Sequence, residues 1–170
     1  MIKIISIIGY SNTGKTHFIE TSIKLLKDKL NINTAVIKNI HKHRIDKEGK
    51  DTQRFNDAGA MLAITQNSYY ETTIFIKKEL SLNNIIHWLE NSPLNIDVIF
   101  VEGFRDTNYP SILCTKNKEE IKEQLNDNIK IISGLICKEP NTKDKYFNIP
   151  LIDIEEEFSL FIQLFGIVSV

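Results

Sequence analysis

The sequence predicts an α/β fold of three layers, with helices on both faces of a mostly parallel central sheet. Two mainly apolar runs, at residues 2–8 and 97–101, carry this prediction, because strands buried on both faces of a parallel sheet are almost continuously apolar. Between residues 16 and 30, apolar side chains recur at the spacing of one helix face, with lysines opposite them. A further strand pattern at residues 34–37 completes a strand–helix–strand unit, which requires a right-handed crossover if its strands are parallel.

The middle of the chain predicts a β-hairpin excursion from this sheet. Residues 61–66 and 71–77 are typical of strands, and they flank Asn67-Ser68, a pair that favours a hairpin turn. Ser81 is expected to cap the N-terminus of a helix over residues 82–89, because its hydroxyl can accept a hydrogen bond from a free N–H of the first turn.

The rest of the chain predicts shorter elements of a single nucleotide-binding domain, which is expected to span residues 1–170. These elements are a helix at 51–58, strands at 112–114 and 129–136 with a helix at 118–125 between them, a strand at Leu151-Ile152, and a terminal helix from Phe158.

The composition limits the partners that this chain attracts by charge alone. Its formal net charge is −1, which gives no footprint for nucleic acid or for an anionic membrane. The last apolar stretch, residues 158–170, is shorter than the ~20 residues of a membrane span. The first residues lack the pattern of a signal peptide, so the cytoplasm is the expected location. Cys114 and Cys137 have no metal-binding or redox spacing and are expected to be small buried hydrophobic residues.

Residues 9–16 match the phosphate-binding pattern G-x-x-x-x-G-K-[ST] at every fixed position. Glycines allow a tight turn whose N–H groups point at phosphate oxygens, and the helix that follows adds its dipole and free amides. Lys15 is expected to bridge the β- and γ-phosphates, and the Thr16 hydroxyl to ligate Mg²⁺. The motif lies between a buried strand and an amphipathic helix, which predicts a P-loop NTPase-type sandwich. The residues expected to hold the nucleotide are Gly9, Ser11, Asn12, Thr13, Gly14, Lys15, Thr16 and His17.

A P-loop site also needs an acidic group on a neighbouring strand, to hold the Mg²⁺ shell or to orient water. Ligands of open α/β sheets bind at the carboxyl ends of the strands. Glu102 ends a predicted strand on that side, whereas Asp97 begins the same strand and points to the opposite rim. Lys15 and Glu102 are therefore the predicted catalytic residues, and Gly103 is expected to permit a sharp exit from the strand.

A polar segment rich in His, Lys and Arg follows the second predicted strand and is expected to emerge beside the P-loop. His41 and His43 face the same way if this segment is extended. They suit contact with phosphate or an anionic partner, a metal ion, or plain solvation, and no third ligand has convincing metal spacing. Asp51 is a second candidate for the Mg²⁺ shell, because a loop here can close over the nucleotide.

Three blocks in this order resemble the molybdopterin-guanine dinucleotide biosynthesis protein B (MobB) family, and a fourth is also similar. They are residues 9–16; Lys38, His41, residues 49–52, Arg54 and residues 58–60; residues 101–105; and, at the end, residues 149–153. The second and third blocks are more specific than a P-loop alone. The blocks contain most of the further candidate site residues, to which His43 of the polar segment is added. These candidates are Lys38, His41, His43, Lys50, Arg54, Gly103 and Arg105.

The resemblance implies a GTP-binding homodimer with at most slow, Mg²⁺-dependent GTPase activity. Such a protein would assist the guanylyltransferase (MobA-type) that attaches GMP to molybdopterin, and it would contact molybdopterin itself. The preference for guanine comes from the resemblance alone, because the chain has no Asn-Lys-x-Asp signature and residues 141–144 are only superficially similar to one.

Two other functions remain compatible with the residues. A small-molecule kinase would use the His/Lys/Arg segment to seat an anionic acceptor, and a metallochaperone GTPase would bind its metal through His41 and His43. Any hydrolysis would be an in-line attack of water on the γ-phosphate, with Lys15 and the loop amides stabilising the developing charge. No side chain stands out as a committed general base, which fits slow turnover.

Overall fold

The computed structural model describes residues 1–40, 45, 49–140 and 145–168 of the chain. These residues form two compact units, one from Met1–Asn39 and Ser92–Val170 and the other from Ile40–Asn91. We call them the sheet unit and the hairpin unit. His41, His43 and the segment 141–144 lie outside the described residues.

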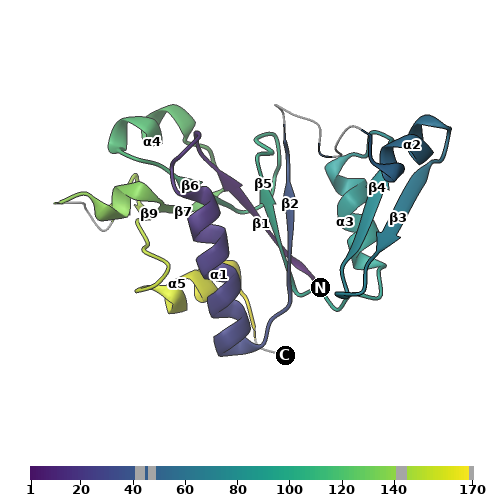
Figure 1. Cartoon of the computed structure of the whole chain (residues 1–170). Helices are drawn as coiled ribbons and strands as arrows, with labels where there is room; N and C mark the ends of the chain where they lie inside the picture. The colour runs from purple at the N-terminus through teal and green to yellow at the C-terminus, as the bar shows by residue number, and fades with distance from the viewer. Residues whose placement is uncertain (41–44, 46–48, 141–144, 169–170) are drawn as a thin grey trace. The chain divides into compact units, whose positions relative to one another are not determined.

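The sheet unit is built on five parallel strands, which confirms the predicted parallel α/β fold (Figure 1). Their order across the sheet is β2-β5-β1-β6-β7. The strands are β1 (Lys3–Ile8), β2 (Thr34–Lys38), β5 (Val98–Glu102), β6 (Ser111–Cys114) and β7 (Ile129–Ser133).

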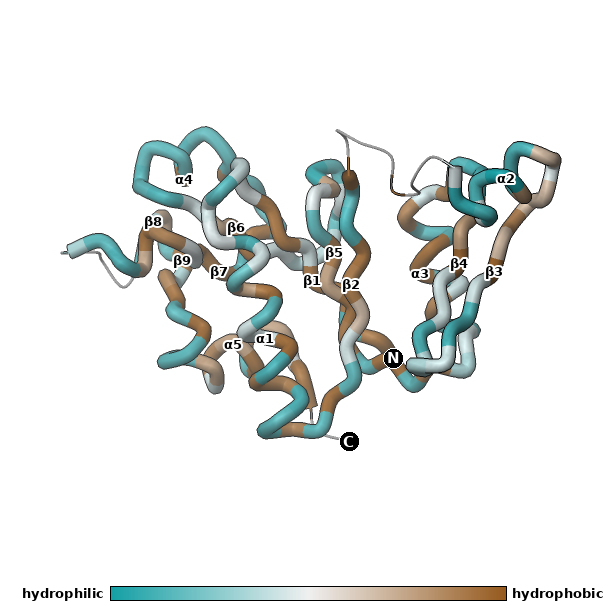
Figure 2. Tube along the Cα trace, viewed as in Figure 1, coloured by the Kyte–Doolittle hydropathy of each residue, from teal (hydrophilic) through white to brown (hydrophobic). Residues whose placement is uncertain are grey.

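Helices cover both faces of this sheet, because alternate strand residues point to opposite sides. On one face, Ile5 and Ile7 pack with residues of α1 (Lys15–Leu30) and α5 (Phe158–Phe165), where the rings of Phe18 and Phe161 meet at 6.1 Å. On the other face, Ile8 packs in a second cluster with residues of α4 (Lys118–Gln124). Figure 2 shows the matching pattern, with apolar strands and a largely hydrophilic α4.

The strand order places a topological switch point at β1. The chain leaves β1 through α1 and reaches β2, which lies beyond β5, whereas β6 lies on the other side of β1. Open α/β sheets bind ligands outside the carboxyl ends of the strands at such a point. Residues 9–14, which join β1 to α1, stand at that position.

The hairpin unit contains the predicted hairpin and its flanking helices. Its elements are α2 (Asp51–Asp57), β3 (Leu62–Gln66), β4 (Thr72–Ile76) and α3 (Leu82–Glu90). The strands β3 and β4 pair antiparallel, with Gln66 opposite Thr72. The turn is wider than the predicted Asn67-Ser68 pair, since it extends over residues 67–71. The reason is the Asn67 side chain, whose Oδ1 accepts from the N–H groups of Tyr69 (2.9 Å) and Glu71 (3.1 Å) and so organises a longer loop.

One face of this hairpin is apolar and open. Leu62 lies opposite Ile76, and Ile64 lies opposite Ile74. The four side chains are 45%, 38%, 59% and 38% exposed in that order. Apolar cross-strand pairs normally stabilise a sheet by burial, and an exposed set of this kind is a feature common to contact surfaces.

The predicted helix cap at Ser81 is confirmed, and its removal should cost stability. The Ser81 side chain accepts a hydrogen bond from the Asn84 N–H at 3.2 Å. A Ser81→Ala variant is expected to lose about 1 kcal/mol of unfolding free energy, because one N–H of the first turn of α3 loses its acceptor. Urea unfolding measures the change. A Ser81→Asn variant keeps a capping oxygen and serves as the control; equal losses in both variants would contradict the cap.

The end of the chain differs from two predictions. The strand predicted at 129–136 stops at Ser133, because Gly134 adopts a φ of +97° and turns the chain into a 3₁₀ helix, η1 (Leu135–Lys138). The last short strand is β9 (Ile149–Pro150), paired with β8 (Lys145–Tyr146), whereas Leu151 makes only an isolated parallel bridge to Ile132. The Asp153 carboxylate accepts from the Glu155 N–H at 3.0 Å, so the chain turns there before a longer ladder forms.

The two cysteines are free, and their burial matches the prediction in one case. Cys114 is fully buried, but Cys137 is half-buried and lines a pocket. The described residues include no helix that is both long and apolar enough to cross a membrane.

Candidate functional site

The loop between β1 and α1 has the backbone of an anion cradle. Gly9, Asn12 and Gly14 all have positive φ angles, of 139°, 60° and 98°. These angles curl the chain back on itself before α1 starts. Gly14 is the N-cap of α1 and makes no side-chain cap hydrogen bond. The first-turn N–H groups of this 16-residue helix are therefore not capped by that residue, which is the arrangement that binds anions at helix N-termini.

Contacts with β6 and η1 fix the position of this loop. A Cβ on Gly9 would overlap the carbonyl oxygen of Cys114, at the end of β6, so only glycine allows this approach. Thr13 is fully buried, and its Oγ1 donates to the Tyr10 carbonyl at 3.0 Å. The carbonyl of Thr13 accepts from the N–H of Leu135 at 3.1 Å. The loop is thus fixed to β6 and to the start of η1.

Lys15 lies against the loop that precedes it. Its Nζ donates to the carbonyls of Gly9 (3.0 Å) and Tyr10 (2.6 Å). Burial lowers the pKa of Lys15, and the charge of Glu102 opposes that shift. A phosphate bound in the loop would add further negative charge beside this ammonium. Ser11, Asn12, Thr16 and His17 are exposed, so the cradle is open to solvent.

Glu102 ends β5, as predicted, and forms an ion pair that the sequence did not reveal. Its Oε2 lies 2.9 Å from Nζ of Lys38, and residues 38 and 102 are register partners at the ends of β2 and β5. The Glu102 side chain is 9% exposed and that of Lys38 is 49% exposed. Gly103 follows with a φ of +85°, and a Cβ there would lie 3.2 Å from the Asn39 carbonyl oxygen. The predicted sharp exit at Gly103 is therefore required by the backbone.

Arg105 reaches the P-loop through Tyr10. Its guanidinium lies over the Tyr10 ring, 5.2 Å from the ring centre, and its Nη2 donates to Gln124 Oε1 at 3.3 Å. The Tyr10 hydroxyl donates to Glu123 Oε2 at 3.1 Å, and this hydrogen bond raises the pKa of Tyr10. Tyr10, Glu123 and Gln124 were missed by sequence reasoning, because no motif links the variable position of a P-loop to a distant helix.

The remaining predicted residues that the structure describes lie in the hairpin unit. Lys50 is the N-cap of α2, and Asp51 and Arg54 form an exposed ion pair at 3.5 Å. The described residues contain no group of three or more His, Cys, Asp and Glu side chains that could hold a metal ion. Roles for Asp51 in the Mg²⁺ shell and for the two histidines of the loop stay predictions.

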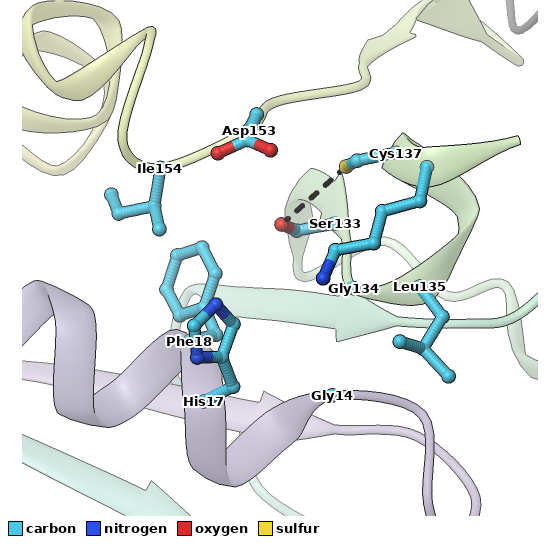
Figure 3. A pocket seen from close by; sticks show the side chains of 10 residues that line it. Gly14, His17, Phe18, Ser133, Gly134, Leu135, Cys137, Asp153 and Ile154 are labelled. Carbon is cyan, nitrogen blue, oxygen red and sulfur yellow. Dashed lines mark hydrogen bonds between the residues drawn. The ribbon is translucent and has the colours of Figure 1, made fainter.

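A pocket of about 290 Å³ adjoins the phosphate loop (Figure 3). The residues that line it come from α1, from the end of β7 and η1, and from the segment after β9. They are Gly14, His17, Phe18, Ser133, Gly134, Leu135, Cys137, Lys138, Asp153 and Ile154. Of these, only Gly14 and His17 were predicted as site residues. Phe18 was expected only as part of the helix, and the other lining residues lie more than 100 residues further along the sequence.

The sheet unit therefore offers the chemistry of a triphosphate site. The curled loop and the Lys15 ammonium suit phosphate oxygens, and the exposed Thr16 hydroxyl and the Glu102 carboxylate are oxygen donors suited to Mg²⁺. These residues come from two stretches of sequence, 9–16 and Glu102, at the carboxyl ends of the neighbouring parallel strands β1 and β5.

Comparison with known proteins identifies the family. The profile of the family described as molybdopterin guanine dinucleotide synthesis protein B (MobB) matches residues 4–137. A putative molybdopterin-guanine dinucleotide biosynthesis adapter protein of Methanocaldococcus jannaschii is 34% identical over 123 residues, which are 69% of this chain and 49% of that protein. The corresponding adapter protein of Haemophilus influenzae is 33% identical over 129 residues, 72% of this chain and 71% of that protein.

Solved structures agree on the fold. The crystal structure of Bacillus subtilis MobB superposes with a TM-score of 0.75 at 21% identity, over 96% of each chain. A MobB homologue from Bacillus stearothermophilus gives a TM-score of 0.66 at 15% identity, over 96% of this chain and 95% of that one. The chain spans about half the length of the archaeal relative. Since the family profile covers most of the sequence, including the P-loop and Glu102, this chain belongs to the MobB family.

Proposed function

We propose that this protein is a GTP-binding adapter of molybdopterin guanine dinucleotide biosynthesis, which assists a molybdopterin guanylyltransferase (MobA-type) in the cytoplasm. The observation that supports this most is the curled loop at residues 9–14, with Lys15 beside it and an uncapped helix N-terminus behind it. The relatives named as adapter proteins in this biosynthesis supply the pathway.

Each residue of the site has a role in this proposal. The loop amides hold the phosphates, and Lys15 leaves the carbonyls of Gly9 and Tyr10 to bridge the β- and γ-phosphates. Thr16 and Glu102 would hold Mg²⁺, which neutralises the phosphate charge when bound. Lys38 occupies one oxygen of Glu102, so this carboxylate is poorly placed to take a proton from water. Slow hydrolysis follows, which suits a protein that carries or presents a nucleotide.

Replacement of Glu102 tests its part in the metal site. A Glu102→Gln variant is expected to need at least about tenfold more Mg²⁺ for half-maximal GTP binding, because loss of one charge-assisted contact costs about 1.5–3 kcal/mol. Titration of Mg²⁺ at fixed GTP measures this. Asp97→Asn is the matched control, since Asp97 precedes the same strand at its far end and its Oδ2 accepts from the Asn33 N–H at 2.8 Å. If both variants titrate like the parent, Glu102 has no role in binding the metal.

A homodimer forms part of the proposal. The open apolar face of the hairpin, made by Leu62, Ile64, Ile74 and Ile76, is the surface on the described residues that best suits a second copy of the chain.

The adapter function is tested with the purified guanylyltransferase and molybdopterin. Addition of this protein together with Mg²⁺ and GTP should raise the yield of the guanine dinucleotide, and equilibrium titration should show tighter binding of GTP than of ATP. Transfer of the labelled γ-phosphate to a small acceptor, with no effect on the guanylyltransferase, would contradict the adapter function and favour a kinase.

A further inference from the structure

We propose that the pocket beside the P-loop holds the base of the nucleotide and that Asp153 selects guanine there. This inference rests on the proposed function, because it concerns the other end of the same ligand. It assigns to residues of the chain a preference that the phosphate loop cannot provide, since the loop contacts only phosphates.

The position of the pocket fits a base whose phosphates lie in the loop. Gly14 belongs to both, as the last loop residue and as a lining residue of the pocket. The hydrogen bond from Leu135 N–H to the Thr13 carbonyl (3.1 Å) connects the far wall to the loop. Gly134 lies so close that an added Cβ would overlap that carbonyl oxygen. The distance between the two subsites is therefore fixed by the main chain.

The size and walls of the pocket suit a flat heterocycle. Its volume of about 290 Å³ lies at the lower end of the ~300–1,000 Å³ typical of ligand pockets, so it has room for part of a nucleotide. Phe18 and Ile154 are buried apolar residues on two of its walls, and Leu135 is 40% exposed on a third. Apolar faces with a few polar groups at the edge are the usual surroundings of a bound base.

Asp153 is the acidic residue among those that line the pocket. Figure 3 shows its carboxylate directed toward the space bordered by Phe18 and Ser133. Oδ1 accepts from the Glu155 N–H at 3.0 Å, and the Asp153 N–H donates to Glu157 Oε2 at 3.3 Å, so the turn orients this side chain. The other polar groups of that wall are engaged, since Ser133 Oγ (2.6 Å) and Cys137 Sγ (3.3 Å) both donate to the Ile152 carbonyl.

A carboxylate in this place distinguishes the purines. It is an acceptor with two oxygens, and guanine presents two adjacent donors, N1–H and N2–H₂. Adenine presents an acceptor at N1 beside its single amino group, so one carboxylate oxygen would face a lone pair. A site built to accept hydrogen bonds rejects an analogue that lacks the donors far more strongly than an apolar pocket does. Lys138, which also lines the pocket, carries a donor suited to the O6 acceptor of guanine.

The test is a change of base preference in Asp153→Asn. An amide offers one acceptor and one donor, which matches xanthine, where a carbonyl replaces the amino group at C2. The variant should bind GTP at least tenfold more weakly than the parent and XTP at least tenfold more tightly, while its affinity for inorganic tripolyphosphate stays unchanged. Asp127→Asn, at an exposed position before β7, should leave all three affinities unchanged.

The outcomes separate this inference from the proposed function. Unchanged GTP and XTP affinities in Asp153→Asn would overturn the base site but leave the phosphate site intact. Failure of the parent to bind GTP or tripolyphosphate would overturn both.

A second experiment uses the unmodified protein, so its result does not depend on whether the Asp153→Asn variant folds. Cys137 lines the pocket, whereas Cys114 is fully buried, so a thiol reagent should label Cys137 alone. Burial raises the pKa of Cys137 to about 11, so labelling is slow. It is nevertheless followed near neutral pH, where guanine keeps its N1–H and Lys15 keeps its charge. Saturating GTP should slow the labelling at least fivefold, and tripolyphosphate should not. Equal labelling rates with and without GTP would overturn the inference.

Discussion

A Lys15→Ala variant is expected to lose at least a hundredfold in affinity for GTP and for tripolyphosphate. Its ammonium, held by the carbonyls of Gly9 and Tyr10, would move to the β- and γ-phosphates on binding. Charge-assisted hydrogen bonds contribute about 1.5–3 kcal/mol each, so the loss of two of them reduces affinity by about two orders of magnitude or more. Equilibrium titration with fluorescent or labelled nucleotide measures this loss.

The matched control for this variant is Lys24→Ala, on an exposed position of the same helix. Both variants should unfold near the parent temperature, since the hydrogen bonds of Lys15 to described residues go to the carbonyls of the loop itself. Similar GTP affinity in Lys15→Ala and Lys24→Ala would remove the P-loop from the nucleotide site.

Because burial lowers the pKa of Lys15, affinity for tripolyphosphate should also begin to fall at a lower alkaline pH than an ordinary lysine would allow.

Sequence reasoning was most successful where a structural feature is local. The β1 strand, the P-loop and α1 are contiguous, so hydrophobic period and glycine spacing were enough to predict them. The Ser81 cap is also a matter of four neighbouring residues. Glu102 required one further step, from the polarity of a parallel strand to the side of the sheet on which it ends.

The missed features depend on register or on long-range closure. Lys38 and Glu102 pair because β2 and β5 are adjacent with these two residues in register. The sequence of one strand does not specify which strand lies beside it. Ser133 and Asp153 line the same pocket as Gly14, and only the assembled sheet brings these distant parts of the sequence together. The strand prediction at 129–136 failed for a related reason: apolar character continues past Ser133, but the chain turns at Gly134 to meet the P-loop.

Because Gly134 packs directly against the phosphate loop, substitution of this glycine should affect both the stability of the protein and nucleotide binding. In Gly134→Ala the added Cβ would overlap the Thr13 carbonyl oxygen, and it would also lie 3.1 Å from the main-chain N and O of Thr115. The φ of +97° adds strain for a non-glycine residue, of about 1–3 kcal/mol. Overpacking against rigid main chain adds about 1–3 kcal/mol more. We therefore expect a loss of about 3 kcal/mol in unfolding free energy.

The substitution should also weaken GTP binding more than tenfold, because relief of the overlap has to move the loop, whose Thr13 carbonyl is bonded to Leu135. Gly59→Ala is the matched control, since Gly59 has a similar φ of +108° but nothing within 4 Å of an added Cβ. It carries the backbone strain without the overlap, so it should lose about 1 kcal/mol and bind GTP like the parent. Chemical unfolding and nucleotide titration of both variants separate the two causes. Equal losses in stability, with normal GTP binding in Gly134→Ala, would mean that the loop and η1 move independently, and the fixed spacing between the phosphate cradle and the base pocket would then be wrong.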